Sequence, residues 1–166
     1  PGVYSFRANL YISLGNYQRA VQDCDEAVRQ NPQLHTAYIN RGVARERLGQ
    51  LDRALADYSQ AIELTRQSAT AYLNRGVIYM RRGQPDKAIE VFIKVLEVDT
   101  ETVETHLMLG SLFRRRGEIE RATRIHQNLI ARPNLDREQR SQALYELAQD
   151  YLKAGLLDRA ENLLLE

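Results

Sequence analysis

The chain has 166 residues, and its content of 43% hydrophobic and 27% charged residues is typical of a folded globular protein and excludes a disordered one. A formal net charge of only +1 gives no whole-protein argument for binding nucleic acid or an acidic membrane. The single cysteine, Cys24, excludes an internal disulfide, and no apolar run approaches the roughly 20 residues that a membrane-spanning helix needs.

A short phrase, in which glycine is followed five residues later by alanine, recurs five times along the chain. The glycines are Gly15, Gly49, Gly83, Gly117 and Gly155, so the first three intervals are 34 residues and the last is 38. A fixed period in this range is typical of a solenoid built from one supersecondary motif. The repeats are predicted over residues 1–34, 35–68, 69–102, 103–136 and 141–166, the last one incomplete, in a single domain over 1–166.

Each repeat contains two apolar patterns of helical period, separated by the glycine. In the second repeat, Leu51, Leu55, Tyr58 and Ile62 recur at three- and four-residue steps, which is the spacing of an amphipathic helix. The glycine ends the first helix because it adopts the left-handed conformation without a Cβ penalty. The predicted helices, in chain order, cover residues 2–14, 18–30, 36–48, 52–65, 70–82, 86–98, 104–116, 120–131, 139–154 and 158–166.

Small residues recur at two further positions of the repeat. Gly42, Gly76 and Gly110 lie seven residues before the punctuating glycine of the three middle repeats, and alanine lies five residues after it in every repeat. Small side chains at paired positions let two helices approach closely and interdigitate. We therefore predict an all-α fold made of antiparallel helix pairs.

These columns together identify a known repeat. In the second repeat Tyr38 is followed by Gly42, the inter-helix Gly49, Ala54 and the aromatic Tyr58. This pattern resembles the tetratricopeptide (TPR) repeat, whose period is also 34 residues, and the resemblance covers the whole chain. It implies a right-handed α-solenoid of about five repeats that acts as a non-enzymatic scaffold for protein–protein interactions.

A narrower resemblance covers residues 84–166. The runs Lys87–Phe92, Glu101–Leu107 and Tyr151–Glu161 resemble lipopolysaccharide assembly protein B, a bacterial TPR family anchored in the inner membrane. The resemblance implies contacts with other proteins on the cytoplasmic side, so we expect a cytoplasmic location.

Residues 1–82 resemble a generic TPR array and differ in style from the rest. The chain is therefore either a divergent natural protein or a chimera of two TPR proteins joined near Gly83, and we favour the chimera because repeats can be joined at matching registers. Its start at Pro1-Gly2, without methionine, is typical of an excised fragment or an engineered protein.

The TPR resemblance implies a concave groove lined mainly by the first helix of each repeat. Projecting the repeat places an apolar floor there beside a row of arginines, which would bind an extended or helical peptide through apolar anchors and acidic side chains. Tyr145, Gln149 and Leu152 project onto the same face. The candidate partner-binding residues are Asn9, Ile39, Asn40, Val43, Arg47, Leu73, Asn74, Val77, Met80, Arg81, Leu107, Ser111, Arg114, Arg115 and Lys153.

Two alternatives stay open for the polar members of this set. The arginines could instead be solvated helix ends, which are favourable beside C-terminal helix dipoles. Asn40 and Asn74 occupy equivalent positions and could either bind the backbone of a ligand or form hydrogen bonds within the repeats.

The sequence gives little support to catalysis, and no cofactor or metal is expected. His35, His106 and His126 fall in different repeat columns without a metal-ligand pattern. His126 and Cys24 occupy the column of the aromatic Tyr58, so we predict that both are packed side chains. Nucleic acid is not expected as a partner, because the arginine row has no interleaved aromatic residues for base stacking.

The last repeat suggests a second function. Its leucines should present an apolar surface without the polar cap that terminal repeats usually carry. The alternative function is therefore that of an engineered or structural TPR array whose main interaction is self-association, as a homo-oligomer. The candidate self-association residues are Leu156, Leu157, Leu163, Leu164 and Leu165.

Overall fold

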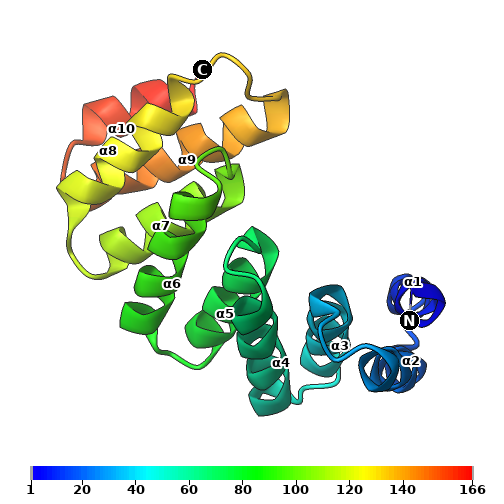
Figure 1. The fold of residues 1–166 in the computed structure, drawn as a ribbon. Coiled ribbons are helices and arrows are strands. Elements are labelled where there is room, and N and C mark those ends of the chain that lie inside the picture. Colours follow the sequence, from blue (N-terminus) through cyan, green and yellow to red (C-terminus); the bar gives the residue numbers. More distant parts are fainter. Residues whose placement is uncertain (1, 166) are drawn as a thin grey trace. The chain divides into compact units, whose positions relative to one another are not determined.

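The computed structural model describes residues 2–165, and over this range the chain forms ten α-helices and no strand (Figure 1). The predicted all-α fold is therefore confirmed. In chain order the helices are α1 (Gly2–Ser13), α2 (Tyr17–Gln30), α3 (His35–Arg47), α4 (Leu51–Leu64), α5 (Ala69–Arg81), α6 (Pro85–Val98), α7 (Val103–Arg115), α8 (Ile119–Ile130), α9 (Arg137–Lys153) and α10 (Leu157–Leu164).

The predicted helices agree with the observed ones to within two residues at each described end. Residue 166, the predicted end of the last helix, lies outside the described residues, and α10 ends at Leu164. The agreement follows from the glycines. All five punctuating glycines have positive φ, between 65° and 85°, and each lies two residues after the last residue of the first helix of a pair.

The turn after each first helix has the same hydrogen bonds in all five pairs. The residue after the glycine donates its backbone N–H to the carbonyl five residues earlier, as in Asn16 N to Tyr11 O at 2.8 Å and Gln84 N to Tyr79 O at 2.9 Å. This bond satisfies a carbonyl that would otherwise lack a partner at the helix end. The second helix begins one residue later, and α6 begins at Pro85, one residue before the predicted start.

The four extra residues between the last two repeats lengthen a helix. The first helices α3, α5 and α7 begin 14 residues before their glycine, whereas α9 begins at Arg137, one turn earlier and two residues before the predicted start. Asp136 accepts from the backbone N–H of Gln139 at 2.8 Å, and the Gln139 side chain accepts from the backbone N–H of Asp136 at 3.2 Å. This reciprocal capping box fixes the new start.

The chain divides into two compact bodies, which are described separately. The N-terminal body is Pro1–Val98 and contains α1 to α6, and the C-terminal body is Asp99–Glu166 and contains α7 to α10. The single domain over 1–166 and its repeat boundaries stay a prediction.

Inside each body, helix pairs touch where the sequence supplies a small residue. A Cβ added to Gly42 would lie 2.6 Å from Cε1 of Tyr58, and one added to Gly76 would lie 2.5 Å from Cε1 of Phe92. The alanine five residues after each punctuating glycine is fully buried in all five pairs. The predicted close packing at these columns is therefore confirmed.

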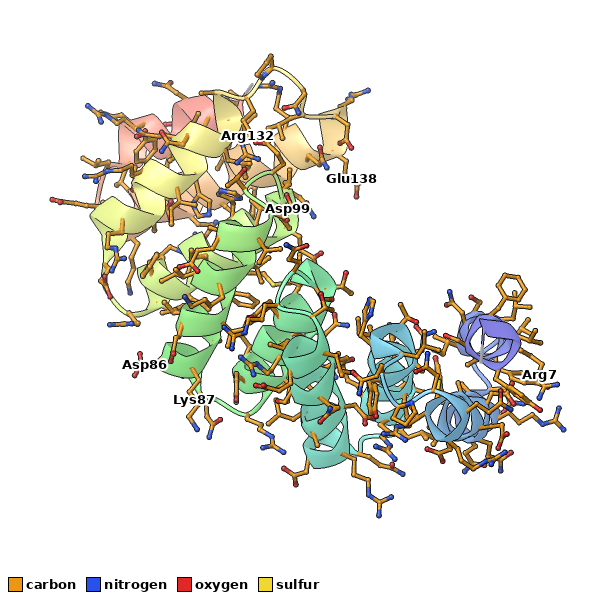
Figure 2. The ribbon with its side chains drawn as sticks, viewed as in Figure 1. Arg7, Asp86, Lys87, Asp99, Arg132 and Glu138 are labelled. Carbon is orange, nitrogen blue, oxygen red and sulfur yellow. The ribbon has the colours of Figure 1, made fainter. Side chains whose placement is uncertain are left out.

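A ladder of partly buried ion pairs connects first helices to second helices in the N-terminal body. Arg7, which projects from α1 in Figure 2, contacts Asp23 at 2.6 Å. One repeat later, Arg41 contacts the buried Asp57 at 2.8 Å and also Asp25 at 2.7 Å. In the third repeat the same two positions hold Arg75 and Val91, so the acidic partner of the arginine is missing.

Candidate protein-interaction surface

The residues of the N-terminal body that were predicted for an apolar floor, called the apolar strip below, are half-buried. Ile39 and Val43 on α3 pack partly against the buried core of α4 and α5 and expose the rest of their side chains. The strip continues along α5 in the same half-buried state. Its α5 members are Leu73, Val77 and Met80.

Two of the predicted arginines beside this strip differ in how their charge is used. Arg47 is exposed and makes no ion pair with any described residue. Nη1 of Arg81 lies 3.0 Å from Oε1 of Glu46, and the other carboxylate oxygen, Oε2, accepts from the Tyr58 hydroxyl at 3.1 Å. The charge of Arg81 is therefore already matched by Glu46 on α3, whereas Arg47 has no acidic partner among residues 2–165.

The two equivalent asparagines form hydrogen bonds between helix pairs. Nδ2 of Asn40 donates to the backbone oxygen of Ser5 at 3.3 Å, from α3 to α1. Asn74 forms a hydrogen bond with Tyr58, whose pKa is raised by burial and by the nearby Glu46 carboxylate. Both amides are thus engaged within the protein, while Asn9 is exposed on α1.

In the C-terminal body, Arg114 joins α7 to α9. Its Nη2 contacts Oε2 of Glu146 at 2.7 Å, and its Nη1 contacts Oδ1 of Asp150 at 2.9 Å and the backbone oxygen of Glu146 at 3.1 Å. Burial lowers its pKa, but the two carboxylates outweigh this effect and raise it. Arg114 is therefore a structural cation whose position is fixed.

An open hollow of about 380 Å³ lies beside Arg114, between the ends of α7 and α9. Its lining consists of Arg114, Arg115, Gln149, Leu152 and Lys153. The Arg115 and Lys153 side chains are exposed, and neither makes an ion pair within residues 2–165. The hollow therefore offers two open cations, an amide and an apolar wall. Leu107 and Ser111, the other predicted residues of α7, are half-buried.

Beneath this hollow lies a buried polar pair. Nδ1 of His126 is 2.5 Å from Oδ2 of Asp150, both side chains are fully buried, and Nε2 of His126 has no hydrogen-bond partner. A Cβ on Gly110 would collide with the His126 ring. His126 is packed, as predicted, and its complete burial leaves no access for a substrate.

Other groups considered for chemistry are also engaged or enclosed. Burial raises the pKa of the Cys24 thiol to about 12, so its nucleophilic thiolate form is scarce at neutral pH. Among the described residues, no group of three or more His, Cys, Asp or Glu side chains is placed to hold a metal ion. None of the described helices combines the length and the apolar character needed to cross a membrane.

Comparison with known families identifies the repeat. Tetratricopeptide repeat models match residues 1–34, 69–100 and 105–140, and a further TPR repeat model matches residues 47–83. The chain contains tetratricopeptide repeats. A curated relative, the protein SGT1 homolog of Oryza sativa subsp. japonica, is 44% identical over 46 residues, which are 28% of this chain and 12% of that protein. The resemblance of residues 84–166 to lipopolysaccharide assembly protein B, and a chimeric origin, stay predictions.

Solved TPR structures share the fold at low sequence identity. MamA from Desulfovibrio magneticus RS-1 matches with a TM-score of 0.84 and 16% identity, covering 99% of this chain and 90% of that one. YrrB, described as a TPR protein with an unusual peptide-binding site, matches with a TM-score of 0.77 and 19% identity over 97% of this chain and 81% of that one. BtubC from P. vanneervenii matches with a TM-score of 0.81 and 23% identity, covering 96% of this chain and 75% of that one. These likenesses show the fold.

The sequence did not identify the acidic partners of the arginines. Three acidic residues that form ion pairs with arginines of the predicted row were not among the predicted site residues. They are Glu46, Glu146 and Asp150. One signal was available for Asp150. It occupies the column that holds the buried Ile78 and Leu112 in earlier repeats, where a carboxylate needs a buried partner.

Proposed function

We propose that this chain is a non-enzymatic scaffold that binds a partner protein through a peptide segment, along the faces of its first helices. The observation that carries the proposal is the hollow between α7 and α9, where Arg115 and Lys153 have no acidic partner among the described residues. Two unmatched cations beside one hollow favour a carboxylate as the bound group.

The fixed position of Arg114 supports this choice. Because Glu146 and Asp150 hold its guanidinium, Arg114 shapes the wall of the hollow without competing for the ligand. Arg115 and Lys153 are free to turn toward an incoming acidic side chain or a C-terminal carboxylate. Charge-assisted hydrogen bonds of this kind are roughly twice as strong as neutral ones.

The apolar part of the ligand has a place next to the cations. Leu152 lines the hollow and is exposed, and Tyr145 is exposed two turns earlier on the same helix. A peptide with an acidic residue close to a large apolar residue would satisfy both parts of the site. The half-buried strip of α3 and α5, beside Arg47, offers the same combination on the N-terminal body. The peptide-binding site named for YrrB adds a precedent for peptide binding on this fold.

A display selection with random 12-residue peptides tests the proposal. The bait proteins are the wild type, an Arg115→Glu/Lys153→Glu variant, and Arg53→Glu as a control. Arg53 is suitable because it is exposed on α4 and makes no ion pair with a described residue. The wild type and the control should enrich acidic–apolar peptides, and the double variant should lose them.

Binding of one enriched peptide, measured by fluorescence anisotropy, sets the magnitude. The double variant should bind about tenfold or more weakly than the wild type, because two charge-assisted contacts become repulsive. Equal enrichment and equal affinity for all three proteins would overturn the assignment of the hollow.

A second candidate function, self-association, is supported by the leucines of the last helix pair. Leu157, Leu164 and Leu165 are strongly exposed, Leu156 is exposed to a lesser degree, and Leu163 is half-buried. Several large apolar side chains exposed on one short helix and its start favour an interaction site. Sedimentation velocity over a range of concentrations tests it, since a constant monomer mass at every concentration would exclude the interaction.

A further inference from the structure

Helix α1 and the residue that follows it, Leu14, carry an exposed apolar stripe. Val3, Phe6, Leu10 and Leu14 are between 49% and 79% exposed, and their spacing places them on one side of the helix. A stripe of large apolar side chains in contact with water is unfavourable, at about 25 cal/mol for each Å². It therefore indicates a surface that another protein element covers.

The repeat shows what kind of element fits this stripe. Leu10 lies five residues before its glycine, and the equivalent Ala44 and Ile78 are fully buried. Ala44 packs in one cluster with Cys24 of the preceding pair, and Ile78 packs in one cluster with Tyr58 of the preceding pair.

The C-terminal body repeats this junction with polar groups. Asp150 occupies the column of Leu10, and it meets His126, which occupies the column of Cys24 and Tyr58. The same two repeat positions therefore meet at three junctions between helix pairs. The residue five before the punctuating glycine of one pair packs on the residue nine after the punctuating glycine of the preceding pair. Within the described chain, Leu10 occupies the position five before a glycine but packs on no preceding pair, and it is 49% exposed. Leu164 occupies the position nine after a glycine but is covered by no following pair, and it is 57% exposed.

Two further junction columns show the same complementarity. Asn40 forms a hydrogen bond with Ser5 across a junction. We call the exposed side of α1 and the exposed side of α9 and α10 the open faces; there the column of Asn40 holds Phe6 and the column of Ser5 holds Tyr145.

In the other column, Tyr17 and Leu48 line one hollow across a junction. The equivalent pair at the open faces is Leu157 with Leu14. Phe6, Leu14, Tyr145 and Leu157 are all exposed by more than half.

The geometry points to head-to-tail docking of two copies of this chain, in which α1 of one copy continues the stack on α9 and α10 of another. Leu10 would pack on Leu164, Phe6 on Tyr145 and Leu14 on Leu157. The contact is heterologous, because each copy contributes a different face. A second copy is the occupant favoured here because its α9–α10 face supplies an exposed apolar partner in each of the three columns. This inference rests on the proposed self-association and adds its receiving surface, α1.

Two single substitutions on opposite faces test the inference by sedimentation velocity of the full chain. Leu10→Arg blocks the α1 face and Leu164→Arg blocks the α10 face, and both sites are exposed, so the fold should persist. Circular dichroism and thermal melting verify this. Gln60→Arg is the matched control, since it adds the same charge on an exposed part of α4. The wild type and the control should gain mass with concentration, and each blocking variant should associate about tenfold or more weakly.

An equimolar mixture of the two blocked variants gives the decisive result. Head-to-tail docking predicts that the mixture forms dimers and nothing larger, because one open face remains on each partner. If Leu164→Arg abolishes association but Leu10→Arg does not, self-association stands and docking on α1 is wrong. If both variants stay monomeric and their mixture does too, docking between α1 and α10 is wrong. If the wild type stays monomeric, both proposals fail.

Discussion

At the scale of single residues, the distance between paired helices depends on one absent methyl group. Gly76 on α5 faces the fully buried ring of Phe92, and an added Cβ would come within 2.5 Å of it. We expect Gly76→Ala to reduce the free energy of unfolding by about 1–3 kcal/mol through overpacking, partly offset by roughly 1 kcal/mol of helix propensity.

Urea unfolding measures this loss. Gly2→Ala is the control because no atom lies within 4 Å of its added Cβ, so its effect should be small. Adding Phe92→Leu to Gly76→Ala should cost less than the two single changes together, since the smaller side chain relieves the collision. Additive costs would show that the close approach is not the cause.

His106 is expected to make the C-terminal body sensitive to acid. Its Nδ1 lies 2.6 Å from the backbone oxygen of Thr102, and Arg132 donates to its Nε2 at 3.2 Å, so the neutral ring fits the site. Arg132, which is labelled in Figure 2, also donates to the backbone oxygens of Thr100 and Glu101, and these bonds fix its charge close to the ring. Burial and this guanidinium lower the pKa of His106 in the folded state.

The sign of the pH effect follows from proton binding. The unfolded chain takes up a proton near pH 6.5, while folded His106 resists it, so stability is lost as pH falls below about 6.5, by at most about 1.4 kcal/mol per pH unit. Urea unfolding of the wild type should therefore weaken more between pH 7.5 and 5.5 than that of His106→Gln. The same pH dependence in both proteins would contradict this role.

At the scale of helices, the ion-pair ladder predicts opposite effects for one substitution at equivalent positions. Arg41→Leu removes one of the two arginines that contact the buried Asp57, while Arg45 stays at 2.8 Å, so it should cost about 1–3 kcal/mol. Arg75 faces Val91 instead of an acid and its Nε is buried without a partner, so Arg75→Leu should stabilise the protein by about 1 kcal/mol.

Urea unfolding of both variants against the wild type gives the comparison. Arg75 also stacks on Tyr72 at 5.6 Å, and losing this contact limits the expected gain. The prediction is that the two variants change the free energy of unfolding in opposite directions. If Arg75→Leu destabilises the protein as much as Arg41→Leu does, this account of the ladder is wrong.

The helices could be predicted from the sequence because their limits are set by local chemistry. Glycine with positive φ ends a first helix wherever it occurs, and Pro85 starts a second helix by the same local logic. The earlier start of α9 is also local, since Asp136 and Gln139 are three residues apart. The expected start at residue 139 allowed for part of the four extra residues but fell two residues short of α9.

The interaction surface could be predicted only in part, because its electrostatics depend on residues far apart in sequence. The repeat placed Arg81 and Arg114 among exposed candidates. Their carboxylate partners lie 32 to 36 residues away, on neighbouring helix pairs. Sequence alone therefore identified the row of cations but not that Arg115 and Lys153 are the members left open beside the hollow.

At the scale of the molecule, stability should be lowest at α1 and α10. Each of these helices buries a single described residue, Ala8 in α1 and Ala160 in α10, whereas α4 buries five. In a repeat array each helix pair is stabilised by its neighbours, so a pair with fewer buried contacts opens more often. Amide hydrogen exchange should be about tenfold or more faster in α1 and α10 than in α4.

Hydrogen exchange also connects this gradient to the proposed docking of copies. If α1 of one copy covers α10 of another, both helices gain a neighbour and should exchange more slowly as the protein concentration rises, while α4 stays unchanged. The Leu10→Arg variant removes one face of this contact. The exchange rates of its α1 and of its α10 should therefore not depend on protein concentration. If protection from exchange rises with concentration in α10 but not in α1, the copies associate through their α10 faces and docking on α1 is wrong.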